Sequence, residues 1–157
     1  MLHPLRDRLA ELSSTALLAP QREVHAFPGS PTQRIDLVLY RGFGHRQALL
    51  DVVITHALTP HGLLSPGRAA SAYEAIKSAE YGHLVDPASQ ILVPVVTDTF
   101  GGWGEAAQQA LQVVSRAFAS RCVDGRGGRL AFFAALNGTL MRAIAGMLLS
   151  NVLPLDA

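Results

Sequence analysis

Two apolar runs, residues 34–40 and 48–55, each carry a single aspartate and are joined by a short turn with two glycines at 41–45. Short runs rich in Val, Ile and Leu are typical of strands that are buried on both faces of a sheet. A carboxylate inside such a strand is costly unless something compensates its charge. Asp36 and Asp51 are therefore the first candidates for a functional site.

The rest of the chain predicts an α/β fold. Turn signals and apolar periodicity predict loops at 59–67 and 124–128. The expected strands are 24–27, 34–40, 48–57 and 91–97, and the expected helices are 4–18, 68–84, 104–121 and 129–151. A three-stranded meander followed by a helical crossover gives a central mixed four-stranded sheet flanked by helices, with two extra C-terminal helices.

Composition limits the class of protein. The 157 residues, of which 49% are hydrophobic, suit a single domain. Its core is expected at about 4–104, followed by a helical extension at about 104–153. The formal charge is only +1, so any nucleic-acid binding must come from a local arginine patch. One cysteine, Cys122, leaves no internal disulfide. Residues 130–149 are expected to be a buried helix, and no membrane contact is predicted.

Lys77 is the only lysine among thirteen basic residues. Two carboxylates on adjacent strands plus a lysine suit metal-dependent cleavage of a phosphodiester, in which Asp36, Asp51 and the carbonyl of Val52 would hold Mg²⁺ or Mn²⁺. Lys77 would orient or deprotonate a water. The alternatives are that the aspartates are strand-end residues and that Lys77 is a solvated helix residue, paired with Glu74 three positions earlier.

The same residues resemble a known family. Arg34-Ile-Asp36, Asp51-Val-Val, the helical segment 73–81 with Lys77, and the strand 93–99 leading to Gly101-Gly-Trp-Gly104 occur in this order. The pattern resembles the PD-(D/E)XK nucleases, whose restriction-endonuclease-like core is αβββαβ. It is most similar to the C-terminal endonuclease domain of site-specific LINE retrotransposon reverse transcriptases.

The resemblance implies a magnesium-dependent endodeoxyribonuclease that nicks target DNA, with Asp36, Asp51 and Lys77 as catalytic residues. It further implies DNA as substrate, a reverse transcriptase in the same or a longer polyprotein, and an intracellular location, nuclear in a eukaryotic retroelement. Candidate DNA contacts are Arg34, Arg41, Arg46, His56 and Tyr81.

The chain departs from the family at three positions. The family's proline is Ile35, the lysine two residues after the second carboxylate is Val53, and the basic residue before the helical tyrosine is Glu80. These departures support an alternative function, a catalytically degenerate nuclease fold that binds nucleic acid or serves assembly.

Other polar residues carry weaker signals. The six histidines lack zinc-ligand spacing, so no zinc is expected. His56 follows Thr55 and could touch substrate, but its position favours a strand-end residue. Asp98 is expected to cap the turn before Gly101. Glu11 and Glu23 are candidates for an auxiliary carboxylate.

Overall fold

The computed structural model describes residues 3–27, 30, 32–59, 62–63 and 65–152. The elements are, in chain order, α1 (Pro4–Thr15), β1 (Pro20–Val24), β2 (Ile35–Phe43), β3 (Arg46–Thr55), β4 (Leu58–Thr59), β5 (Gly62–Leu63), α2 (Arg68–Tyr81), the 3₁₀ turn η1 (Gly82–Leu84), β6 (Gln90–Asp98), α3 (Glu105–Ala119) and α4 (Gly125–Val152). The predicted α/β class, with a helix before the sheet and two C-terminal helices, is confirmed.

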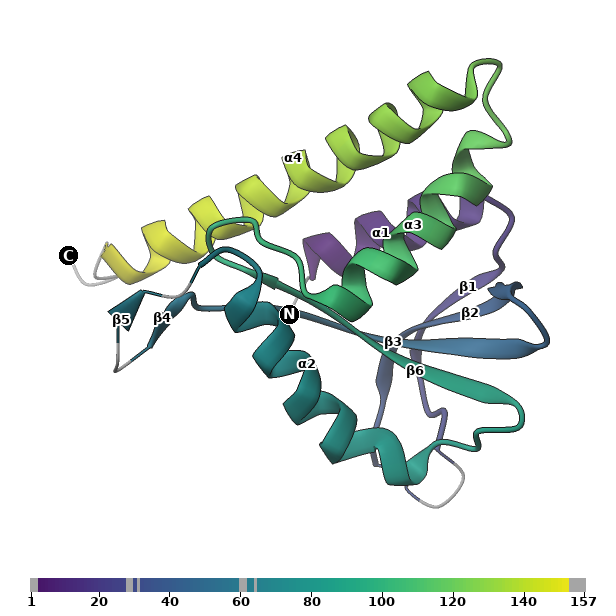
Figure 1. The fold of residues 1–157 in the computed structure, drawn as a ribbon, viewed down its shortest axis with the longest axis horizontal. Helices are drawn as coiled ribbons and strands as arrows, with labels where there is room; N and C mark the ends of the chain where they lie inside the picture. Colours follow the sequence, from purple (N-terminus) through teal and green to yellow (C-terminus); the bar gives the residue numbers. More distant parts are fainter. Residues whose placement is uncertain (1–2, 28–29, 31, 60–61, 64, 153–157) are drawn as a thin grey trace.

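The main sheet has the strand order β1-β2-β3-β6. β1 and β3 both pair antiparallel with β2, whereas β6 pairs parallel with β3, so the sheet is mixed as expected. The parallel pair requires a crossover, and α2 supplies it. Helices α1, α3 and α4 cover one face of the sheet, and α2 lies against the other (Figure 1).

Strand alternation divides the apolar side chains between these two faces. Leu37 and Leu50 belong to the large core that also contains residues of α1, α3 and α4. Val38 and Leu49 belong to a smaller core on the α2 side, together with Phe27. Because side chains two residues apart share a face, the same alternation places Asp36 and Asp51 on the α2 side.

The predicted first strand at 24–27 is wrong, since β1 spans Pro20–Val24. β1 lies at an edge of the sheet, and its residues are polar and largely exposed, so it has no hydrophobic pattern to detect. It forms through its backbone ladder with β2, from Pro20 opposite Leu39 to Val24 opposite Ile35. The apolar signal at Phe27 instead reflects burial, because this ring stacks on Tyr81 with centroids 5.8 Å apart.

Two expected loops contain structure. The short strands β4 and β5 pair within the predicted loop at 59–67, of which residues 60–61 and 64 lie outside the described part. The predicted connector at 124–128 mostly forms the first turn of α4, which begins at Gly125. The carboxylate of Asp124 accepts hydrogen bonds from the N–H groups of Arg126 and Gly127, and this capping offsets the low helix propensity of the glycines.

The segment 130–149 is helical as predicted, but the expectation that it is a buried helix is wrong, because only one stripe of it is buried and Leu130, Leu148 and Leu149 are exposed. Phe132, Leu136, Leu140 and Ile144 pack in the large core. The helix also has the length and apolar composition of a membrane span over Gly125–Ser150, and 28% of its apolar 18-residue stretch is buried in the protein.

Candidate functional site

Asp36 and Asp51 lie opposite each other on neighbouring strands. Leu37 pairs with Leu50, Val38 with Leu49 and Leu39 with Ala48, so the same register places Asp36 across from Asp51. Oδ2 of Asp36 accepts a hydrogen bond of 2.8 Å from the N–H of Val52. The carbonyl of a strand residue points to the same neighbouring strand as its N–H, so the Val52 carbonyl also faces β2.

Asp51 is the buried member of the pair, with 8% of its surface exposed. Its Oδ2 forms no hydrogen bond in the described part of the chain, although the ammonium of Lys77 lies 3.4 Å away. A buried carboxylate oxygen without a hydrogen-bond donor is costly. The Lys77 ammonium compensates part of this cost by its charge, so a bound cation would have to share or replace that contact.

Lys77 reaches this oxygen from α2. Its Nζ lies 3.4 Å from Asp51 and 3.2 Å from Oε2 of Glu80, and its side chain is only 15% exposed. The rings of Tyr81 and Tyr73 lie 5.0 and 6.0 Å from the same ammonium, within the range of cation–π attraction. Lys77 is thus enclosed by two carboxylates and two rings, which contradicts the solvated-residue interpretation.

The pKa values of Lys77 and Asp51 reflect this enclosure. Burial lowers the pKa of Lys77, but the charge of Asp51 and the hydrogen bond to Glu80 outweigh it and raise that pKa overall. Burial raises the pKa of Asp51, Lys77 lowers it, and the nearby charge of Asp36 raises it again. The net direction for Asp51 is upward, mainly because the attraction of Lys77 does not fully offset the burial of the carboxylate.

Of the predicted DNA contacts, Tyr81 lies beside Lys77, whereas Arg34 and His56 are exposed near strand ends. Tyr81 joins the cluster through Lys77, and burial raises the pKa of its hydroxyl. Arg34 is exposed two residues before Asp36, where its Nε donates to Nε2 of His25 over 3.0 Å. His56 is exposed after the end of β3.

Arg41 and Arg46 are not brought to the carboxylates. They flank the β2–β3 turn, five residues from Asp36 and Asp51 respectively. That spacing corresponds to about 17 Å along an extended strand. These two arginines therefore lie away from the carboxylate pair.

The structure buries two further carboxylates, those of Glu74 and Asp98. Their hydrogen-bond partners were not predicted, or only partly predicted, from the sequence. Glu74 does not pair with Lys77. It accepts hydrogen bonds from the N–H groups of Ala106 (3.0 Å) and Ala107 (2.8 Å), and so caps α3 from α2. The only signal in the sequence was its helical spacing of four residues from Ala70, on the face of α2 that the structure shows to be buried. Asp98 caps its turn as predicted, but it is fully buried and also accepts from the N–H of Gly67.

Neither candidate auxiliary carboxylate contributes to the pair. Glu11 pairs with Arg8 at 2.8 Å, and Glu23 pairs with Arg6 at 2.5 Å. Within the described ranges no group of three or more His, Cys, Asp or Glu side chains is placed to hold a metal. The donor set available for Mg²⁺ is thus Asp36, Asp51 and the Val52 carbonyl. Such hard oxygens fit a Mg²⁺ ion that keeps several of its waters.

The main cavities of the described structure do not include the two aspartates or Lys77. The most apolar one, of about 590 Å³, lies between α1, β3 and α4, away from the α2 side. The carboxylate pair thus lies outside these cavities, beneath α2, with Asp51 buried and Asp36 partly exposed.

Comparison of the chain with the models of known protein families and with curated proteins finds no match.

Proposed function

We propose that this chain is a metal-dependent DNA endonuclease domain with a restriction-endonuclease-like αβββαβ core. The element order, the mixed sheet β1-β2-β3-β6 and the position of α2 between β3 and β6 support this assignment. The substrate is a DNA phosphodiester, and the expected product is a nick in target DNA. A retrotransposon setting, with a reverse transcriptase in the same or a longer polyprotein and a nuclear location, belongs to the same proposal.

One observation carries the proposal. Asp51, inside a buried strand, has an oxygen that accepts no hydrogen bond from the described residues, and it lies beside a second carboxylate and the only lysine of the chain. A purely structural ion pair explains Lys77 and Asp51, but it does not explain why Asp36 lies opposite Asp51 and raises its pKa. A divalent cation between the carboxylates would relieve this repulsion.

Each residue has a defined role in the proposed reaction. Asp36, Asp51 and the Val52 carbonyl bind the ion, and Mg²⁺ or Mn²⁺ supplies an activated water and neutralises charge on the scissile phosphate. Lys77 is protonated in the metal-free protein, because its pKa is raised. It therefore serves as a positive charge that holds the phosphate, and it becomes a more competent proton donor or acceptor when a nearby cation lowers its pKa.

A second function is favoured by a different observation. Glu80 stands where the family has a basic residue, and it lies 3.2 Å from Lys77, so it competes for the ammonium with any bound phosphate. This arrangement suits a catalytically degenerate nuclease fold that binds nucleic acid or serves assembly. In that case the ion pair is retained for stability alone.

A nicking assay on supercoiled plasmid in millimolar Mg²⁺ or Mn²⁺ tests the proposal. The wild-type chain should produce open circles, and Asp36→Asn and Asp51→Asn should abolish the activity. Glu105→Gln is a matched control, because it removes an exposed carboxylate from the first turn of α3. Loss of nicking in the control as well would point to a nonspecific effect of charge.

A parallel measurement separates the two functions. In the endonuclease, divalent cations should raise the melting temperature of the wild type and leave that of Asp36→Asn unchanged. If neither ion raises the melting temperature and no nicking occurs, although the chain binds DNA, the degenerate function is the correct one.

A further inference from the structure

The charges of the chain are unevenly distributed along its length. Residues 105–152, from the start of α3 to the end of α4, contain five arginines and two acidic residues, whereas residues 1–104 contain eight basic and nine acidic residues. The helical layer formed by α3 and α4 is therefore basic, although the whole chain carries only +1. A local excess of this kind attracts polyanions.

Four of these arginines, all exposed, lie in the segment from the last turn of α3 to the first turns of α4, which we name the arginine corner: Arg116, Arg121, Arg126 and Arg129. In the described part of the chain none of the four forms an ion pair. By contrast, the N-terminal arginines Arg6, Arg8 and Arg22 are all paired with carboxylates. The corner thus keeps its charge available to a ligand.

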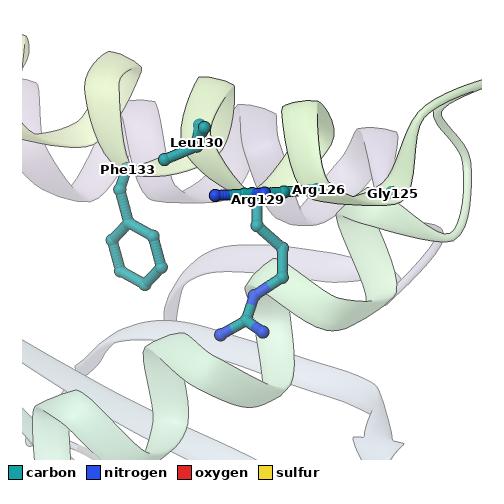
Figure 2. A pocket seen from close by; sticks show the side chains of 5 residues that line it. All are labelled: Gly125, Arg126, Arg129, Leu130 and Phe133. Atoms are coloured by element: carbon teal, nitrogen blue, oxygen red, sulfur yellow. The ribbon is translucent and has the colours of Figure 1, made fainter.

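The corner contains a hollow at the start of α4. A cavity of about 450 Å³ is lined by Gly125, Arg126, Arg129, Leu130 and Phe133. Figure 2 shows the Arg129 guanidinium and the Phe133 ring projecting from the same side of the helix, as expected for residues four apart. The Phe133 ring is half-buried and is held edge-on against Phe132, with centroids 5.2 Å apart.

The arginines, not the helix terminus, provide the positive charge. The first N–H groups of α4 are already bound by the carboxylate of Asp124. Guanidinium groups recognise phosphate oxygens with paired N–H donors, and an aromatic ring beside them offers a surface on which a base can stack. Leu130, which is 67% exposed, extends that apolar surface.

We propose that the arginine corner binds a single-stranded segment of nucleic acid, with Arg126 and Arg129 on phosphates and Phe133 against an unstacked base. A strand with unpaired bases uses both the charge and the ring, whereas a duplex presents mainly phosphates. Because α4 covers the sheet face opposite α2, this surface is distinct from the carboxylate pair (Figure 1). The inference goes beyond the proposed cleavage and does not depend on a metal.

Fluorescence anisotropy with a labelled single-stranded oligonucleotide, in the presence of a chelator, tests the proposal. Arg126→Ala/Arg129→Ala should weaken binding about tenfold or more, and should reduce the slope of log affinity against log salt by about 1.4. Arg8→Ala/Arg22→Ala is the matched control, because it removes the same charge from paired arginines. Equal losses in the two double variants would overturn the proposal.

Two further arms test the kind of ligand. Phe133→Leu, checked for an unchanged melting temperature, should weaken binding to the single strand several-fold more than binding to a duplex of the same length. Equal effects on both would overturn the single-strand assignment. Binding to phosphatidylserine vesicles that depends on Arg126 and Arg129, without binding to the oligonucleotide, would assign the surface to a membrane instead.

Single-strand binding at the arginine corner and the endonuclease function can be disproved independently of each other. Asp36→Asn should lose nicking and keep its affinity for the oligonucleotide. The Arg126→Ala/Arg129→Ala variant should lose affinity for the single strand and keep the metal-induced rise in melting temperature.

Discussion

Nζ of Lys77 lies 3.4 Å from Oδ2 of Asp51, an oxygen that no hydrogen-bond donor in the described structure satisfies. The two residues are 26 positions apart in the chain and belong to different layers of the fold, α2 and β3. Both side chains are largely buried, so the contact is weakly screened by solvent. Two features follow: the stability of the metal-free protein depends on this pair, and a cation at Asp51 must compete with Lys77.

Removal of the lysine charge should destabilise the metal-free protein. Lys77→Met keeps the apolar stem but leaves Asp51 uncompensated, and we expect a loss of about 2–3 kcal/mol in the free energy of unfolding. Urea denaturation at neutral pH in a chelator measures the loss. Glu80→Gln is the control, because Glu80 is half-exposed and its pairing should contribute less than about 1 kcal/mol. A Lys77→Met protein as stable as the wild type would show that the pair contributes nothing to folding.

The raised pKa of Asp51 makes a signed prediction for pH. The carboxyl binds a proton more readily in the folded than in the unfolded protein, whose value is near 3.8. Its contribution to stability is therefore fully present below that pH and is lost as pH rises through the folded pKa. We expect the stability of the wild type relative to Asp51→Asn to decline from pH 4 towards neutral pH.

Urea midpoints of the two proteins, compared at several pH values in a chelator, provide this measurement. Lys77 stays protonated throughout that window, since its pKa is raised above 10.5, so its titration does not contribute. A relative stability that instead increases with pH would mean that Lys77 overcompensates the Asp51 charge.

Replacement of Lys77 by alanine should affect catalysis and metal affinity in opposite directions. Lys77→Ala should slow nicking by about a hundredfold or more, as for the loss of a positioned charge or proton-transfer group. The same change removes a cation 3.4 Å from Asp51, so Mn²⁺ should bind severalfold more tightly in calorimetric titrations. Lys77→Arg should restore part of the nicking if charge alone is needed. Nicking at the wild-type rate in Lys77→Ala would remove this residue from the mechanism.

Glu74 should be required for the packing of α2 against α3. Both of its carboxylate oxygens accept N–H groups at the start of α3, so Glu74→Gln leaves one N–H facing an amide group and Glu74→Ala leaves two N–H groups unsatisfied. We expect losses of about 1–3 kcal/mol in the free energy of unfolding.

A substitution on the other side of the same contact should have a comparable effect. A Cβ at Gly104 would overlap the Glu74 carboxylate, so Gly104→Ala should displace the cap. Thermal unfolding of Gly104→Ala and of Glu74→Ala measures both losses, and the double variant should lose less than their sum. Strict additivity would indicate that the two residues act independently.

The sequence by itself predicted the order of the helices and of the main-sheet strands, and it placed Asp36 and Asp51 on adjacent strands. Both follow from local periodicity: alternation every two residues places Asp36 with Val38 and Asp51 with Leu49, and the helical pattern around Lys77 marks α2. Apolar runs as strong as β2 and β3 allow few other assignments, because both of their faces must be buried.

Only the tertiary structure decided which groups these side chains meet. Lys77 pairs with Asp51 and Glu80, whereas Glu74 caps α3 instead of pairing with Lys77. The polar strand β1 forms because its backbone pairs with β2 at the edge of the sheet. These contacts join residues from different elements, and no local pattern encodes the distance between them. Their physical basis is the burial of charge, whose energy depends on every neighbour that the folded chain brings close.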